Sequence, residues 1–266
     1  MRLEDLFQVK KPIIGMLHLR PLPGSPSFSG SFKSVQKTVL TDAQTLTKGG
    51  VDGILVENFG DVPFFPDHVP AHTIAYMTRI SNEVKRRFEL PLGINVLRND
   101  AMAAMAVASA TDAEFIRVNI HTGAMVTDQG LIQGRAHETL RLRTQLQSEV
   151  KIFADVLVKH ATPLGVQSLT QTAKDSYYRG IADALIVSGT ETGVAPAIER
   201  VKTVKAAVPE VPILVGSGVT PSNLETYLDY TDGFIIGTWF KKEGVTTNPV
   251  DSKRVQHIVS KMKEFR

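Results

Sequence analysis

The sequence contains no cysteine and almost no excess of charge of either sign. Without cysteine, disulfides, thiolate nucleophiles and cysteine-ligated metal sites are excluded. Lysine and arginine number 30 and acidic residues 27, which leaves a net charge of only +3. Runs of like charge and aromatic RNA-binding motifs are also missing. We therefore expect no nucleic-acid partner, because a basic field would be needed to attract one.

Long apolar stretches are absent as well. The most apolar helical segment, Ala101–Ala110, is short and flanked by Asp100 and Asp112, so it cannot cross a bilayer. Met1–Phe7 carries acidic residues where a signal peptide needs an apolar core. The sequence predicts a cytoplasmic protein with no transmembrane segment, and it leaves peripheral association with a membrane open.

Eight short apolar runs recur along the chain, separated by longer segments of helical periodicity. Unbroken apolar runs are typical of strands buried on both faces of a parallel sheet. Between the first two runs, Val35, Val39, Ala43 and Leu46 share one helical face. The predicted strands are Pro12–Leu19, Gly53–Asn58, Leu92–Leu97, Phe115–Ile120, Lys151–Val158, Ala184–Ser188, Ile213–Gly216 and Phe234–Gly237.

The residues that precede these strands alternate in kind. Aspartate and a small residue precede the even-numbered strands, whereas proline precedes the first, third and seventh; Lys151 at the fifth breaks the pattern. Such alternation suits a (β/α)8 TIM barrel, whose odd and even strands occupy different layers. We predict one α/β barrel domain over residues 1–266, with an open doubly wound sheet as the alternative. The last helix is predicted to begin at Asn248-Pro249.

Two of the predicted strands end in glycine. Gly216 and Gly218 follow the seventh strand, and Gly237 ends the eighth. Glycine lets a phosphate approach backbone N–H groups, and barrels commonly bind phosphate after these two strands. A phosphorylated small molecule is therefore the predicted ligand.

Polar side chains gather at the strand ends, where barrel enzymes carry their chemistry. We predict catalysis by Asp155, Glu57 and His18, because carboxyl and imidazole groups transfer protons. The residues predicted to bind ligand are Asn95, Arg117, Asn119, His121, Lys159, Ser188, Thr190, Gly216, Ser217, Gly218, Gly237, Thr238 and Lys241.

Asp155 interrupts an apolar strand, where an unpaired charge is costly. It is either a general acid/base or metal ligand, or else one half of a buried salt bridge with Lys159 or Arg117. His18, Glu57 and Asp155 could form an oxygen and nitrogen site for Mg, Mn or Zn. No recognised ligand spacing supports that divalent metal, and no cofactor is predicted.

Three loops that follow strands are long, at residues 20–31, 59–71 and 121–134. Loops of this length commonly act as lids or binding surfaces. The shorter loop Ser188–Gly193 combines hydroxyls with glycines, and we predict that it grips phosphate.

The motifs after the seventh and eighth strands resemble those of the ribulose-phosphate-binding barrels. Four further segments resemble the BtpA/SgcQ family: Lys11–Pro26, Gly49–Gly53, Gly93–Asp100 and Phe240–Asp251. The resemblance implies a sugar-phosphate type of barrel. It also implies a role in photosystem I biogenesis, with thylakoid association in cyanobacteria. Arg20 and Pro26–Phe28 are similar to the non-photosynthetic SgcQ-like members.

Two functions remain open from the sequence. The first is an isomerase, epimerase or lyase acting on a phosphorylated metabolite. The second is a non-catalytic assembly factor for photosystem I or another membrane complex, which uses the barrel as a scaffold. Barrels of this type often self-associate, and we expect a homo-oligomer.

Overall fold

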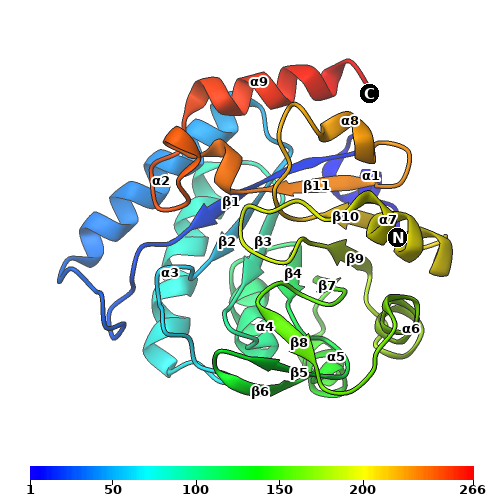
Figure 1. Cartoon of the computed structure of the whole chain (residues 1–266). Coiled ribbons are helices and arrows are strands. Elements are labelled where there is room, and N and C mark those ends of the chain that lie inside the picture. The colour runs from blue at the N-terminus through cyan, green and yellow to red at the C-terminus, as the bar shows by residue number, and fades with distance from the viewer.

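A computed structural model describes all residues, 1–266. Eight parallel strands close into a barrel in the order β1-β11-β10-β9-β7-β4-β3-β2, which confirms the predicted (β/α)8 fold (Figure 1). In chain order they are β1 (Ile13–His18), β2 (Gly53–Glu57), β3 (Leu92–Asn95), β4 (Phe115–Val118), β7 (Lys151–Asp155), β9 (Ala184–Val187), β10 (Ile213–Val215) and β11 (Gly233–Ile236).

The alternation of residues before the strands has a physical cause. A carboxylate that precedes an even strand accepts a hydrogen bond from the first N–H of the preceding odd strand, and so satisfies a buried backbone donor. Asp52 accepts from Ile13 at 2.7 Å, and Asp232 accepts from Ile213 at 2.8 Å. Asp183 accepts in the same way from Ile152, the second residue of the fifth strand, at 2.8 Å. Before β4 the acceptor is Glu114, not the aspartate of the sequence pattern.

Helices cover the outside of the barrel, and the last packs against the first long one (Figure 1). Their apolar stripes face the strands, as predicted for Val35, Val39, Ala43 and Leu46. The helices are α1 (Leu3–Phe7), α2 (Phe32–Gly49), α3 (Ala71–Arg87), α4 (Ala101–Ala110), α5 (Ala136–Gln145), α6 (Leu169–Lys174), α7 (Ile198–Ala207), α8 (Leu224–Tyr227) and α9 (Ser252–Lys263), with short turns of other helix types at η1 (Asp175–Arg179), η2 (Thr238–Phe240) and η3 (Lys242–Gly244).

The predicted start of the last helix was wrong. Helix α9 begins after Asp251, whose carboxylate accepts hydrogen bonds from the N–H groups of Lys253 and Arg254. Two residues earlier, Pro249 lies in the preceding segment, where Val250 N–H donates to Asp42. An aspartate N-cap satisfies free N–H donors of the first helical turn.

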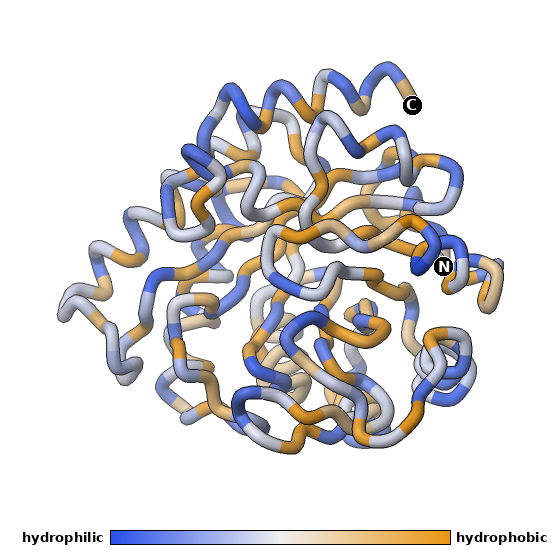
Figure 2. The backbone as a smooth tube through the Cα atoms, in the orientation of Figure 1, coloured by the Kyte–Doolittle hydropathy of each residue, from blue (hydrophilic) through white to orange (hydrophobic).

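The core has two parts, one between strands and helices and one inside the barrel. Figure 2 shows apolar segments concentrated along the strands, with mixed character along the outer helices. Inside the barrel, Leu3 and Phe7 of α1 join Phe115 and Phe153 and close its amino-terminal end. Polar chemistry is therefore confined to the opposite end, which we call the mouth.

A small antiparallel sheet, outside the barrel, forms a flap beside the mouth. It consists of β5 (Ala124–Thr127), β6 (Gly130–Gln133) and β8 (Ala161–Pro163), in the order β6-β5-β8. The prediction of a loop over residues 121–134 was therefore wrong. None of the helices combines the length and the apolar character that crossing a membrane requires.

Candidate functional site

A pocket in the mouth, with a cavity volume of about 30 Å³, is formed where the ends of several barrel strands meet. His18 and Glu57 end neighbouring strands and are register partners, so their side chains project from the same level of the barrel. Of the sixteen predicted site residues, the pocket is lined by nine: His18, Glu57, Arg117, Lys159, Gly216, Ser217, Gly218, Gly237 and Thr238.

Arg117 and Asp155 form a bidentate ion pair at the floor of the mouth. Arg117 Nε donates to Asp155 Oδ2 at 2.8 Å, and Nη2 donates to Oδ1 at 2.9 Å. Both side chains are almost completely buried. Of the alternatives left open for Asp155, the structure has the salt bridge, and its partner is Arg117. The catalytic role of Asp155 stays a prediction. Both of its carboxylate oxygens already accept hydrogen bonds from Arg117.

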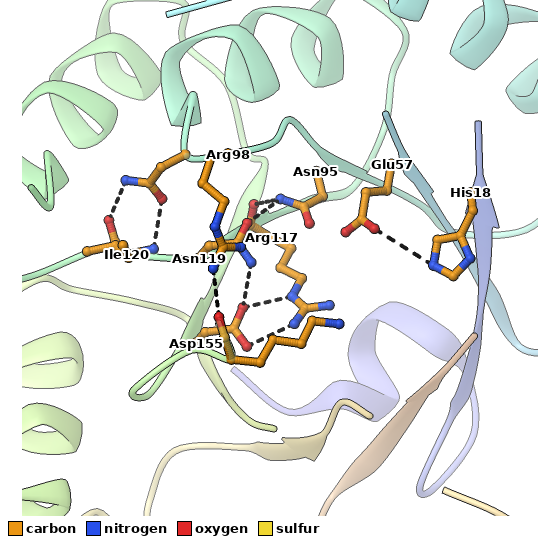
Figure 3. A network of polar contacts seen from close by, with 10 residues as sticks. His18, Glu57, Asn95, Arg98, Arg117, Asn119, Ile120 and Asp155 are labelled. Carbon is orange, nitrogen blue, oxygen red and sulfur yellow. Dashed lines mark hydrogen bonds and ion pairs between the residues drawn. The ribbon is translucent and has the colours of Figure 1, made fainter. Parts of the chain in front are cut away.

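Two asparagines extend this pair into a network. Asn119 Nδ2 lies 3.4 Å from Asp155 Oδ2, and Asn95 Nδ2 donates to Asn119 Oδ1 at 3.0 Å. Figure 3 shows the Asn119 side chain between Asn95 and the Asp155 carboxylate. The two asparagines hold the ion pair in place, and neither lines the pocket.

Glu57 and His18 form the second polar group of the mouth. Glu57 Oε1 lies 3.7 Å from His18 Nε2, and Figure 3 shows the two side chains turned toward each other. Burial raises the pKa of the Glu57 carboxyl, although Lys159 and Arg117 oppose the shift. Burial and the positive charges of Lys241 and Lys159 hold the pKa of His18 well below its usual range. A neutral imidazole therefore lies beside a carboxyl whose raised pKa suits general acid/base catalysis.

Lys159 brings an amine to the same pocket. It follows β7, and its backbone carbonyl accepts a hydrogen bond from Arg98 Nη2 at 2.6 Å. Burial, followed by the charge of Arg117, lowers the pKa of Lys159 to about 8.

The loops after β10 and β11 provide backbone donors. None of the hydrogen bonds in the chain uses the backbone N–H of Ser217, Gly218 or Gly237. These residues line the pocket together with Thr238 and with Gly193 of the preceding loop. Free N–H groups on adjacent loops are suited to binding an anion.

The glycines of these loops serve the protein's own packing, which the sequence did not reveal. A Cβ on Gly218 would lie 2.1 Å from Ala195 N, and one on Gly237 would lie 2.8 Å from His18 Cε1. A Cβ on Gly216 would meet Ile186 at 2.6 Å. At these three positions glycine is therefore required by the protein's own packing, because a Cβ would collide with neighbouring atoms.

Four further predicted ligand residues, besides the two asparagines, lie away from the pocket. Lys241 Nζ forms a buried ion pair with Asp42 at 2.9 Å, so its ammonium is already neutralised. His121 Nε2 lies 2.8 Å from the Gly180 carbonyl oxygen. Ser188 is fully buried, and Thr190 uses its carbonyl to accept a hydrogen bond from His160 N–H. Each lies near a strand end, but none of these side chains reaches the pocket.

Pocket residues that we had not singled out include Thr192 and Gly193. Both belong to the loop Ser188–Gly193, which we predicted to bind phosphate. The sequence did not indicate which of its residues would face the mouth. The suggested metal set is not assembled. No three histidine or acidic side chains converge in the structure, because Asp155 is turned toward Arg117 and away from His18 and Glu57.

The closed barrel defines a (β/α)8 barrel protein with a polar pocket at the carboxyl ends of its strands. Residues 9–264 match the model of the BtpA family, and the chain belongs to that family.

Relatives match over nearly their full length. The chain is 46% identical over 257 residues to an uncharacterised protein of Thermococcus kodakarensis, covering 97% of each. It is 43% identical to the photosystem I biogenesis protein BtpA of Synechocystis, covering 99% of this chain and 92% of the relative. It is 34% identical to the putative sgc region protein SgcQ of Escherichia coli, covering 99% and 98%.

Solved structures share the fold at low identity. Phosphoribosyl anthranilate isomerase of Thermus thermophilus superposes with a TM-score of 0.57 at 11% identity, covering 96% of this chain and 100% of that one. Orotidine 5'-phosphate decarboxylase of Pyrococcus horikoshii gives 0.58 at 13% identity, covering 94% and 99%. These similarities establish the barrel fold alone.

Proposed function

We propose that this protein is an enzyme that binds a phosphorylated small molecule in the mouth and transfers a proton on it, as an isomerase, epimerase or lyase does. One observation carries the proposal. The unpaired N–H groups of Ser217, Gly218 and Gly237 share a pocket with the acid/base pair Glu57 and His18. A phosphate held at the first group would place the attached carbon chain across the barrel toward the second.

The charges of the mouth support an anionic ligand. Arg117 is neutralised by Asp155, whereas Lys159 has no ion-pair partner. Burial works against the negative form of Glu57. The pocket therefore has a positive balance in a site of low dielectric, where an incoming phosphate is attracted more strongly than in water.

The chemistry of Glu57 and His18 supports proton transfer. A carboxyl group with a raised pKa accepts a proton from carbon or donates one to oxygen more readily near neutral pH. His18 stays neutral beside it and can relay or stabilise that proton. Phe59 packs on the His18 ring at 4.7 Å between centroids and fixes its position.

The solved structures with this fold favour the same substrate class. Their printed names include an isomerase of a phosphoribosyl compound and a decarboxylase of a nucleoside 5'-phosphate. Many barrel enzymes bind phosphate at the loops after the seventh and eighth strands, which here are β10 and β11.

The test is deuterium exchange. The protein is incubated in D2O with a panel of aldose and ketose phosphates, and NMR follows loss of the proton next to the carbonyl. We expect exchange with wild type and with Glu83→Gln, a partly exposed control on α3, and at least a roughly hundredfold loss with Glu57→Gln. Equal rates for wild type and Glu57→Gln would contradict the role of Glu57.

A second candidate is a docking role in the assembly of a membrane complex. The name of the Synechocystis relative favours it, as do four exposed apolar side chains: Val126 and Leu131 on the flap, and Leu164 and Val166 directly after it. In a cyanobacterium lacking its own BtpA, this role predicts rescue of photosystem I by Glu57→Gln and no rescue by Val126→Ser/Leu131→Ser. Rescue that requires Glu57 would favour the enzyme.

A further inference from the structure

We propose that Lys159 is a nucleophile that forms a Schiff base with an aldehyde or ketone carbonyl of the substrate. The inference deepens the proposed function and rests on it for the phosphate group. It narrows the substrate to phosphorylated carbonyl compounds, such as aldose or ketose phosphates.

The backbone around Lys159 is built to hold one conformation. Leu157 and His160, on either side, have left-handed φ values of 52° and 54°. Such values are unfavourable for residues with side chains and persist where the surrounding structure imposes them. Here the tight turn after β7 directs Lys159 into the pocket.

Hydrogen bonds from three other parts of the barrel fix this turn. Arg98, after β3, donates to the Lys159 carbonyl at 2.6 Å, and His160 N–H donates to the Thr190 carbonyl at 3.1 Å. Arg200 of α7 lies 3.4 Å from the Leu157 carbonyl. A reactive amine needs such fixed placement, because a small misplacement from the carbonyl carbon is costly in rate.

The amine itself is left without a partner. Lys159 Nζ forms no hydrogen bond and no ion pair, although two carboxylates lie in the same mouth. Asp155 is occupied by both nitrogens that Arg117 presents. The contrast with Lys241 is direct, because that ammonium is buried and paired with Asp42 at 2.9 Å. A structural lysine is neutralised in this protein, whereas Lys159 is held free.

The surroundings make this amine nucleophilic near neutral pH. Burial and the neighbouring Arg117 lower the pKa of Lys159 to about 8. At pH 8 about half of the amine is then neutral, on the order of a hundredfold more than for a lysine of ordinary pKa. Desolvation beside another cation is the arrangement that activates Schiff-base lysines.

The reaction balances with groups of the pocket. The lone pair of neutral Nζ attacks the carbonyl carbon, and the C=O π pair moves to oxygen, which takes a proton from Glu57. The nitrogen of this carbinolamine returns a proton to Glu57, and the hydroxyl leaves as water with a second proton from the same carboxyl. The product is a C=N bond to Nζ, which keeps its one remaining proton and is therefore a protonated imine beside the Glu57 carboxylate. That cation then withdraws electrons from the neighbouring carbon, whose proton Glu57 accepts.

The test traps the imine. The full-length protein is mixed at pH 8 with glycolaldehyde phosphate or with glycolaldehyde, reduced with borohydride, digested, and mapped by mass spectrometry. Borohydride delivers hydride to the imine carbon and leaves a stable secondary amine. Lys151, at the opposite end of the same strand, is the internal control. We expect adduct at Lys159 to exceed adduct at Lys151 by about tenfold or more, with the phosphorylated aldehyde labelling more than its parent.

The outcomes separate the two proposals. Preferential labelling of Lys159 by both aldehydes to the same extent supports the Schiff base and contradicts the phosphate site. Labelling of Lys159 no greater than that of Lys151 by either aldehyde overturns the Schiff base, and leaves phosphate binding to its own test. The measurement uses wild-type protein, so it does not depend on a variant folding. Lys159→Arg, which keeps the charge, should lose deuterium exchange if the imine is required.

Discussion

Arg117 and Asp155 hold each other through two hydrogen bonds, from Nε at 2.8 Å and from Nη2 at 2.9 Å. This pairing occupies both carboxylate oxygens of Asp155 and two nitrogens of the Arg117 guanidinium. It leaves the amine of Lys159 and the carboxyl of Glu57 without ionic partners of their own in the pocket. The charges of Arg117 and Asp155 also affect the pKa values of Lys159 and Glu57.

Breaking the pair should destabilise the fold strongly. Asp155→Asn leaves the guanidinium of Arg117 buried without its counter-charge, which typically costs about 3–5 kcal/mol. Urea denaturation of wild type and variant measures the loss. The double variant Arg117→Met/Asp155→Leu removes both charges and should recover most of it. A single variant as stable as wild type would contradict the account of this pair.

Lys241 should matter for stability and not for ligand binding. Its ion pair with Asp42 is buried, and Asp42 also accepts from Val250 N–H at 2.9 Å. We expect Lys241→Met to lose about 3 kcal/mol or more in urea denaturation, because it leaves the aspartate uncompensated. The rise in melting temperature produced by a sugar phosphate should be unchanged. Loss of that rise, in a variant that still folds, would return Lys241 to the ligand site.

Lys159 should reduce the stability of the protein below pH 8. Its folded-state pKa of about 8 lies below the ordinary value, so the unfolded chain binds the extra proton between about pH 8 and 10.4. Stability therefore rises with pH across that window, and the cost of the charged amine is fully present below it. Lys159→Met should be about 1–3 kcal/mol more stable than wild type at pH 7. The gain should disappear near pH 10.5, as followed by urea denaturation at each pH.

Glu57 should give a pH dependence of the opposite sense. Its folded-state pKa is raised by burial, so the folded protein keeps a proton that the unfolded chain releases. Its contribution to stability is full below the unfolded pKa, near 4.3, and is lost as the pH rises through the folded pKa. Denaturation from pH 4 upward should show a smaller decline in Glu57→Gln than in wild type. Parallel curves would show that the carboxyl is not perturbed.

The barrel was predictable from the sequence because its determinants are local. Each strand is a short apolar run, and each even strand follows a residue that can accept a hydrogen bond from its neighbour. The aspartates at 52, 183 and 232 perform this function, and Glu114 performs it where the pattern had suggested Asp112. The flap was missed because β5 gains one of its two neighbours, β8, from a segment more than thirty residues further along the chain.

The site was only partly predictable, since position near a strand end does not give the direction of a side chain. His18, Glu57 and Lys159 reach the pocket, whereas Lys241 turns outward to Asp42 on α2, about 200 residues away in sequence. After the tight turn at Leu157, Lys159 lines the pocket, and Asp155 pairs with Arg117 instead. No glycine marks that turn in the sequence, so its left-handed backbone could not be predicted.

The central claim is that the mouth binds a phosphorylated small molecule, and a thermal-shift titration tests it most directly. Wild-type protein is heated with ribose 5-phosphate, ribulose 5-phosphate, dihydroxyacetone phosphate or inorganic phosphate, and with ribose as the unphosphorylated control. Ligand that binds only the folded state raises the melting temperature by mass action. We predict a concentration-dependent rise with at least one sugar phosphate and none with ribose. No rise with any of the phosphorylated compounds at millimolar concentration would contradict the claim.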